Sequence, residues 1–369
     1  MDRKRSPSHR PGVTWKTTSR KRKKYPETRS EAVPRFRRSL HFPRRLRGSY
    51  LRQRILVSIA AFFVAYLINF ILPRLEPGNI VNVIASSDLL PLQRQQLVQQ
   101  LGLNQPLWNQ FLKYLVDTFG SFPPSFGVSF AHYPLTVWTL VSTALPWTLL
   151  LVGVSQLIAW PLGVLLGAWL AWHRGSKADN AMFALSNVMW GVPSYWLATI
   201  LIFIFAIQLK IFPPSLSTSG GATTLSAGAV VNILGHSFLP ILTLVILNMP
   251  LQALVMRNNM VNILEEDYVM AAKARGLRQR TLILGHAARN ALLPSITNLA
   301  LSFGNILSGA YLVEIIYSYP GMGYLIEQSA LVRDYPVLEG VFFVSAILVI
   351  LANLLADISY LYLDPRVEY

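Results

Sequence analysis

The sequence predicts an all-α integral membrane protein with six transmembrane helices. Of its 369 residues, 53% are hydrophobic and 14% are charged, and the mean hydropathy is +0.40. Soluble domains carry about a quarter charged residues. A helix needs about 20 mainly apolar residues to cross the hydrocarbon core. Apolar runs near this length occur six times, at 55–72, 149–172, 181–209, 238–256, 294–313 and 340–363. Asp357 is the one charged residue in these runs.

A basic segment, residues 1–54, precedes the first run. It holds 19 Lys and Arg residues and 3 acidic ones, with five prolines and few apolar side chains. Such a segment buries too little apolar surface to fold, so we expect disorder up to about Phe42. Bases beside a span stay in the cytoplasm and attract anionic membrane lipid. Nucleic-acid binding is the alternative interpretation of this charge, and we expect no nucleic-acid partner.

The first transmembrane helix is expected at residues 55–72, followed by an extracytoplasmic segment at 73–135. Within that segment, leucines and Phe111 recur at helical spacing on both sides of a break between Gly102 and Pro106. This pattern predicts two short amphipathic helices.

Residues 136–369 are expected to form a five-helix core with a loop at 257–293. If the N-terminus is inside, the cytoplasmic segments hold 28 Lys and Arg residues and the outer ones 5. Cytoplasmic loops carry the excess of bases, so both termini are expected in the cytoplasm. Residues 317–339 have the pattern of a Pro-Gly turn, a short helix and a second turn.

The cytoplasmic loop contains the stretch LEEDYVMAAKARGL, residues 264–277. Its acidic residues, Glu265 to Asp267, come first, and Lys273 and Arg275 come last, as suits the helix dipole. Gly276 suits a left-handed C-terminal cap. We therefore expect a short helix with Tyr268, Ala272 and Arg275 along one face and Ala271 beside them. A solvated helix at the membrane surface is the alternative.

Residues 264–294, LEEDYVMAAKARGLRQRTLILGHAARNALLP, resemble the EAA loop in permease subunits of ATP-binding-cassette importers. The long form of this loop is typical of the oligopeptide, dipeptide and nickel branch. Met270 departs from the broad motif, which has Glu there. Other stretches resemble the same branch in the same order: LGLNQPLWNQFLKYL (101–115), VPSYWLA (192–198), YPGMGYLIEQSALVRDYPVLEGV (319–341) and NLLADISYLYLDPRVEY (353–369).

The resemblance implies a type I permease fold whose cytoplasmic coupling helix docks on an ATPase subunit. It also implies four partners: a second homologous permease, two ATP-binding subunits and an extracytoplasmic substrate-binding protein. Peptide is the expected cargo, and oligosaccharide or nickel is the alternative. The candidate ATPase-coupling residues are Glu266, Asp267, Tyr268, Ala271, Ala272, Arg275, Gly276, Arg289, Asn290 and Pro294.

Motifs for chemistry in this chain are absent from the sequence. No G-x-x-x-x-G-K-[ST] phosphate loop and no H-E-x-x-H pair occurs. We therefore expect no catalytic residue, no metal and no cofactor in this chain, with ATP and Mg²⁺ held by the partner ATPase subunits.

Two further interpretations come from other classes of protein. An intramembrane enzyme would use Asp357 or Glu314, since acids inside a membrane are often functional. For Asp357 we favour a structural role, such as pairing with Arg366. A membrane anchor would hold nucleic acid or a ribosome through the basic tail. The substrate path stays open, because several amides suit either a polar path or bridges between helices: Gln156, Asn187, Asn248, Asn305 and Asn353.

Overall fold

A computed structural model describes residues 44–75, 90–101, 104–215, 227–278, 281–282 and 287–363. This part of the chain is helical, and its one β-feature is an isolated bridge between Val128 and Thr136. The elements are α1 (Arg44–Leu75), α3 (Pro91–Leu101), α4 (Leu107–Phe119), α5 (Val137–Trp172), α6 (Lys177–Gly191), α7 (Ser194–Leu201), the π-helix η1 (Ile202–Gln208), α8 (Ala227–Leu264), α9 (Asp267–Ala274), α10 (Ala288–Ile316), α11 (Met322–Leu331) and α12 (Tyr335–Leu363).

Four described helical segments are long and apolar enough to cross a membrane: Arg52–Leu75, Val137–Trp172, Val230–Leu264 and Tyr335–Leu355. A fifth span results if the bent pair Lys177–Gly191 and Ser194–Gln208 is counted as one. The predicted run 294–313 lies within α10, where the side chains of residues 301–309 are outside the described part. By length and composition, the described residues thus give an all-α membrane protein with four or five spans.

The prediction of one continuous span over residues 181–209 is wrong. Helix α6 ends at Gly191, α7 begins at Ser194, and the two axes differ by 103°. Val192 is extended, with ψ of 119°, because the ring of Pro193 excludes the helical conformation of the residue before it. The second half then widens into the π-helix η1.

The other membrane helices extend beyond the apolar runs that predicted them. Helix α1 begins at Arg44, within the basic segment and just after the expected disorder ends at Phe42, and α5 begins at Val137 rather than Leu149. A charge or a proline ends an apolar run, but it does not end the backbone hydrogen bonding of a helix that continues to the membrane surface. Residues 1–43, which make up most of the basic segment, lie outside the described residues.

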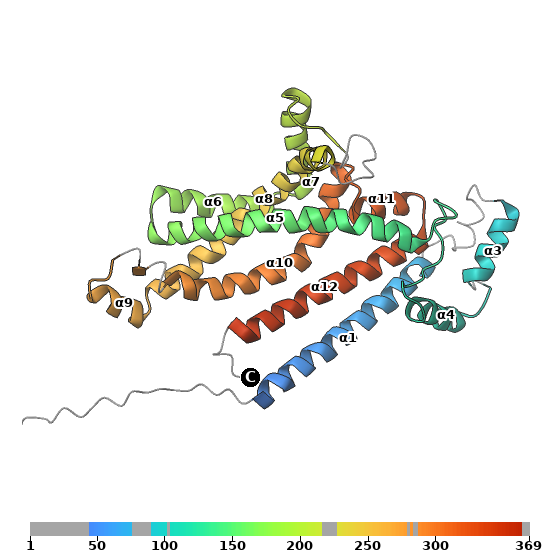
Figure 1. Ribbon diagram of the computed structural model, residues 1–369, viewed down its shortest axis with the longest axis horizontal. Coiled ribbons are helices and arrows are strands. Elements are labelled where there is room, and N and C mark those ends of the chain that lie inside the picture. Colours follow the sequence, from blue (N-terminus) through green and yellow to red (C-terminus); the bar gives the residue numbers. More distant parts are fainter. Residues whose placement is uncertain are drawn as a thin grey trace, which may run out of the picture. The chain divides into compact units, whose positions relative to one another are not determined.

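Helices α5, α8 and α10 lie side by side (Figure 1). Helix α5 approaches α8 at two glycines: a Cβ atom on Gly163 would lie 2.6 Å from the Cβ of Gln252, and one on Gly167 would lie 3.0 Å from the backbone nitrogen of Arg257. Small residues at this spacing let two membrane helices pack backbone to backbone. A buried cluster between these helices includes Leu151, Leu239 and Tyr319.

Helix α1 lies along α12, and ion pairs join the two helices near both ends (Figure 1). Arg74 and Glu339 approach to 2.9 Å and are largely buried, whereas Arg54 and Asp357 are 3.5 Å apart. Asp357 thus has a structural partner, as we favoured. That partner is Arg54, and Arg366 lies outside the described residues.

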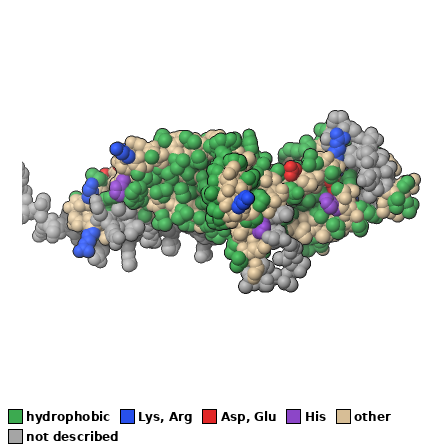
Figure 2. Space-filling model, turned by 90° about the horizontal axis from the view of Figure 1, so that it is seen from above, with side chains coloured by type: hydrophobic (Ala, Val, Ile, Leu, Met, Phe, Trp, Pro, Cys, Tyr) green, Lys and Arg blue, Asp and Glu red, His purple; other side chains and the backbone are tan. Residues whose placement is uncertain are grey.

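The segment between α1 and α5 contains the two short helices that the leucine spacing predicted, α3 and α4. Helix α4 is amphipathic: it buries Phe111 and Tyr114 against Tyr66 and Phe70 of α1. On the face of the molecule that Figure 2 shows, hydrophobic side chains form a broad band and charged ones are few. Such a band is typical of a surface that contacts lipid or another membrane subunit.

Candidate functional site

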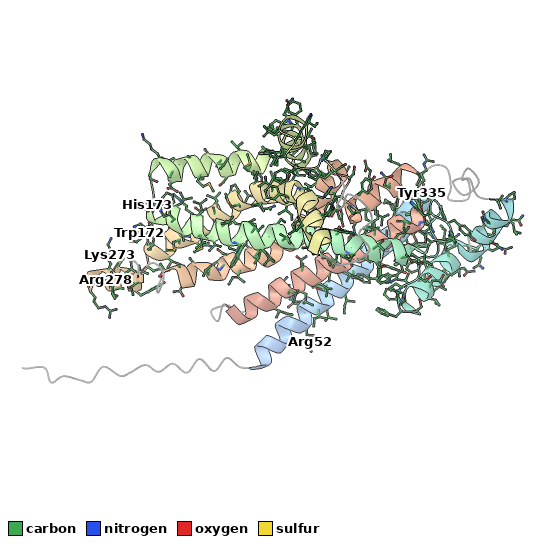
Figure 3. All side chains as sticks on the ribbon, turned by 45° about the horizontal axis from the view of Figure 1, so that its top comes forward. Arg52, Trp172, His173, Lys273, Arg278 and Tyr335 are labelled. Atoms are coloured by element: carbon green, nitrogen blue, oxygen red, sulfur yellow. The ribbon has the colours of Figure 1, made fainter. Side chains whose placement is uncertain are left out.

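The candidate site is α9, the short helix between α8 and α10. Figure 3 places Lys273 of α9 and nearby Arg278 at the same end of the molecule as Trp172 and His173, which end α5. Tyr335, the first residue of α12, lies at the opposite end (Figure 3). The helix therefore lies where α5 ends and where α6 and α10 begin.

The ends of α9 are fixed by the local sequence. Glu266 holds the N-cap position with ψ of 142°, and Asp267 lies in the first turn, where the helix dipole favours negative charge. At the other end Gly276 has φ of +76°, the left-handed conformation expected of it. Its amide donates to the carbonyl of Lys273, and the amide of Leu277 donates to that of Ala272. These two bonds form a Schellman motif, which ends the helix sharply.

One face of α9 is buried against the rest of the chain. Val269 and Ala272 are 1% and 3% exposed, and they pack with Leu282 and against Trp172 and Ile263. The expectation that Ala272 lies on an accessible face with Tyr268 and Arg275 is therefore wrong. This buried face attaches α9 to the helix bundle, and the small side chain of Ala272 allows α9 to lie close to Trp172.

The opposite face of α9 is exposed. We call it the outer face and define it by Asp267, Met270, Ala271 and Ala274, all of which are exposed. These positions recur at i, i+3, i+4 and i+7, so they share one side of the helix. Met270 is 56% exposed at its centre. Met270 is the residue that departs from the broad EAA motif. Its position three residues after Asp267 and four before Ala274 puts it on the outer face.

Tyr268 lies beside the outer face and contacts the next helix. Its hydroxyl oxygen accepts a hydrogen bond of 2.8 Å from the side-chain amide of Asn290 on α10. The structure thus brings together two candidate residues that are 22 positions apart. Pro294 lies one turn further along α10 and is exposed. Arg289 is also on α10, but its side chain lies outside the described part.

An ion pair connects the turn before α9 to the turn after α5. Arg174 and Glu265 approach to 2.6 Å, with both side chains exposed. Exposed pairs of this kind contribute about 0–1 kcal/mol each to the free energy of unfolding, so this contact adds little to stability. Arg275 is exposed at the C-cap of α9.

The acids considered for enzyme chemistry have structural partners. Glu314 is buried and accepts a 2.6 Å hydrogen bond from the amide of Gly323, while Asp357 pairs with Arg54. Within the described ranges, no group of three His, Cys, Asp or Glu residues is arranged to hold a metal ion. Around α9 the described residues thus present one exposed helix face and one buried face.

Comparison with known proteins assigns this chain to a family. Residues 163–369 match the family described as binding-protein-dependent transport system inner membrane component. The chain belongs to this family. It is therefore a transport permease of the cell membrane with several spans, as the resemblance predicted, and not an enzyme in its own right.

Relatives of this permease match nearly its whole length. The oligopeptide transport system permease protein AppB of Bacillus subtilis is 32% identical over 87% of this chain and 100% of its own length. The di/tripeptide transport system permease protein DppB of Pseudomonas aeruginosa is 32% identical over 87% of this chain and 99% of its own length. The dipeptide transport system permease protein DppB of Escherichia coli is 29% identical over 87% of this chain and 98% of its own length.

Proposed function

We propose that this permease forms part of the path of an ATP-driven peptide importer and that α9 is its coupling helix. The outer face of α9 supports this proposal most directly, because it is a small, exposed surface on a helix whose other face is anchored to α5 and α8. A rigid helix that is anchored on one side and free on the other can transmit the movement of a docked subunit to the bundle.

The proposed assembly contains a second homologous permease, two ATP-binding subunits and an extracytoplasmic substrate-binding protein. ATP and Mg²⁺ belong to the ATP-binding subunits. The family description, which names a binding protein and an inner membrane component, supports this composition.

We propose six spans with both termini in the cytoplasm, with α10 as a full span and the bent pair α6 and α7–η1 as another. The excess of bases on the α9 side supports this orientation. In this arrangement α3, α4 and α11 lie on the outer side, where a binding protein would deliver its cargo.

Small peptides are the proposed cargo, because relatives that match 87% of this chain are named as oligopeptide, di/tripeptide and dipeptide permeases. Uptake of a radiolabelled tripeptide by vesicles containing the full assembly tests this. Competition by unlabelled peptides supports the proposal. Competition by oligosaccharide or Ni²⁺, with none by peptides, would assign one of those cargoes instead.

The coupling role is tested with Ala271→Trp, which adds bulk to the outer face without changing the buried face. The variant is expected to insert normally and to bind the ATP-binding subunits weakly. Leu331→Trp on α11 is the matched control, since Leu331 is 74% exposed at a helix end far from α9. Equal binding of the ATP-binding subunits by both variants would contradict the role of α9.

A further inference from the structure

The start of α6 is joined to α8 by a two-point ion pair. The guanidinium of Arg257 donates from Nε to Oδ1 of Asp179 at 2.9 Å and from Nη2 to Oδ2 at 2.8 Å. Asp179 is 3% exposed, although it lies in the first turn of its helix. A bidentate pair fixes the orientation of the two groups as well as their distance, which a single contact does not.

The same carboxylate also holds the turn between α5 and α6. Oδ2 of Asp179 accepts a 2.9 Å hydrogen bond from the amide of Gly175, and Ser176 caps α6 by accepting from the amide of Asp179 at 3.2 Å. Gly175 has φ of +80°, which lets the chain reverse direction there. One side chain therefore connects the α5–α6 turn, the first turn of α6 and α8.

Arg257 lies at the level where α8 is already fixed to α5 and α9. Its backbone faces Gly167 of α5, where a Cβ atom would approach to 3.0 Å. Closer to the end of α5, Trp172 packs under Val269 and Ala272 of α9. Helices α5, α8 and α9 thus form a closely packed unit, and the ion pair attaches α6 to it.

The attachment of α6 also affects the broken span that continues from it. After Gly191 the chain breaks at Pro193, turns by 103° and continues through α7 into the π-helix η1. Ser186 provides a second link by donating to the carbonyl of Pro250 at 2.9 Å. Breaks and π-turns in membrane helices occur where backbone groups are satisfied by neighbouring elements and where helices change conformation.

We infer that Asp179 and Arg257 are positioning residues that make the broken span α6–α7–η1 follow the movement of α9. This inference rests on the proposed coupling role of α9 and extends it. The movement of α9 is transmitted to α8 and from α8, through this ion pair, to α6. Without the pair, α9 would still dock and move, but α6 would move with it incompletely.

A distance measurement within the assembled transporter tests the inference. The chain has no cysteine, so spin labels attach only where cysteines are introduced. Labels at Lys273→Cys on α9 and Leu185→Cys on α6 are expected to keep one narrow distance in the resting and ATP-trapped states. In the Asp179→Asn variant the distribution of distances between these two labels is expected to broaden or shift on ATP binding. A control pair, Lys273→Cys with Asn262→Cys on α8, is expected to stay narrow in both backgrounds.

Uptake provides the second readout. Asp179→Asn is expected to keep ATP hydrolysis within about twofold and to lower the peptide transported per ATP by about tenfold. Arg257→Lys keeps the charge and loses the two-point contact, so a smaller loss of the same kind is expected. If Asp179→Asn prevents assembly, the Arg257→Lys variant decides the question. The inference would be overturned if the deciding variant transported as much peptide per ATP as the wild type and kept the same α6–α9 distance. It would also be overturned if the α6–α9 distance in the wild type changed on ATP binding.

The two proposals fail differently. If α9 does not dock on an ATP-binding subunit, Ala271→Trp leaves subunit binding unchanged, and the proposed function is wrong. If α9 docks but the Asp179–Arg257 pair transmits nothing, Ala271→Trp lowers subunit binding while Asp179→Asn transports normally.

Discussion

The side-chain amide of Asn290 donates a 2.8 Å hydrogen bond to the hydroxyl of Tyr268, joining α10 to the exposed side of α9. This contact lies at the edge of the buried face, because Tyr268 is one turn before Ala272 on the same side of the helix. Helix α9 is therefore supported from α5 and α8 at its buried face and from α10 beside that face.

Removing either partner of this bond is expected to loosen α9 without unfolding the bundle. Tyr268→Phe and Asn290→Ala each remove one hydrogen bond, which contributes about 0.5–1.5 kcal/mol. Hydrogen exchange of the α9 amides measures the effect. The double variant is expected to exchange no faster than the more affected single variant, since both remove the same bond. Additive effects would show that the two residues act separately.

The C-terminal cap of α9 is expected to depend on glycine. A residue with a Cβ at φ of +76° costs about 1–2 kcal/mol, so Gly276→Ala should fray the last turn. Gly276→Pro should do more, because proline cannot adopt this φ and lacks the amide that bonds to Lys273. In both variants we expect normal insertion and reduced peptide uptake per ATP. Gly276→Asn tolerates the conformation better and serves as the control. Equal uptake by the alanine and proline variants and the wild type would contradict this account of the cap.

The first turn of α11 is expected to require glycine at residue 323, because Tyr311 and Glu314 both approach it closely. A Cβ atom on Gly323 would lie 2.9 Å from the carboxylate oxygen of Glu314 that bonds to its own amide. Gly323→Ala should therefore cost about 1–3 kcal/mol through overpacking. Gly153→Ala is the control, because its added methyl group would meet open space. Thermal unfolding in detergent separates the two variants, and equal melting temperatures would show that the first turn of α11 tolerates a side chain at residue 323.

The buried pair of Arg74 and Glu339 is expected to fix α1 on α12. Arg74→Met leaves Glu339 as an unpaired buried charge, and such losses cost about 3–5 kcal/mol. The double variant Arg74→Met/Glu339→Leu removes both charges and should recover most of that stability. The rate at which a protease cleaves each variant in detergent measures this difference in stability. A double variant less stable than Arg74→Met would show that the pair contributes more than charge neutralisation.

The class of the protein and the ends of α9 follow from local sequence. Apolar runs predict membrane helices because hydrocarbon excludes charge. The cap of α9 was predictable because acids, bases and Gly276 act on their own helix. The break near residue 192 has a local signal in Pro193, but neighbouring helices decide whether a membrane proline bends or breaks its helix. The face of α9 that is buried depends on Trp172 and Leu282, which lie outside the helix. For the same reason, nothing in the spacing of Asp179 and Arg257 showed that they form a pair.

Cysteine crosslinking of the outer face to an ATP-binding subunit tests the central claim most directly. Met270→Cys in the assembled transporter is expected to crosslink to that subunit in the resting state and during ATP turnover, while the buried Val269→Cys is not. Failure of Met270→Cys to crosslink in any nucleotide state, in an assembly that still hydrolyses ATP and imports peptide, would contradict the claim that α9 couples the two.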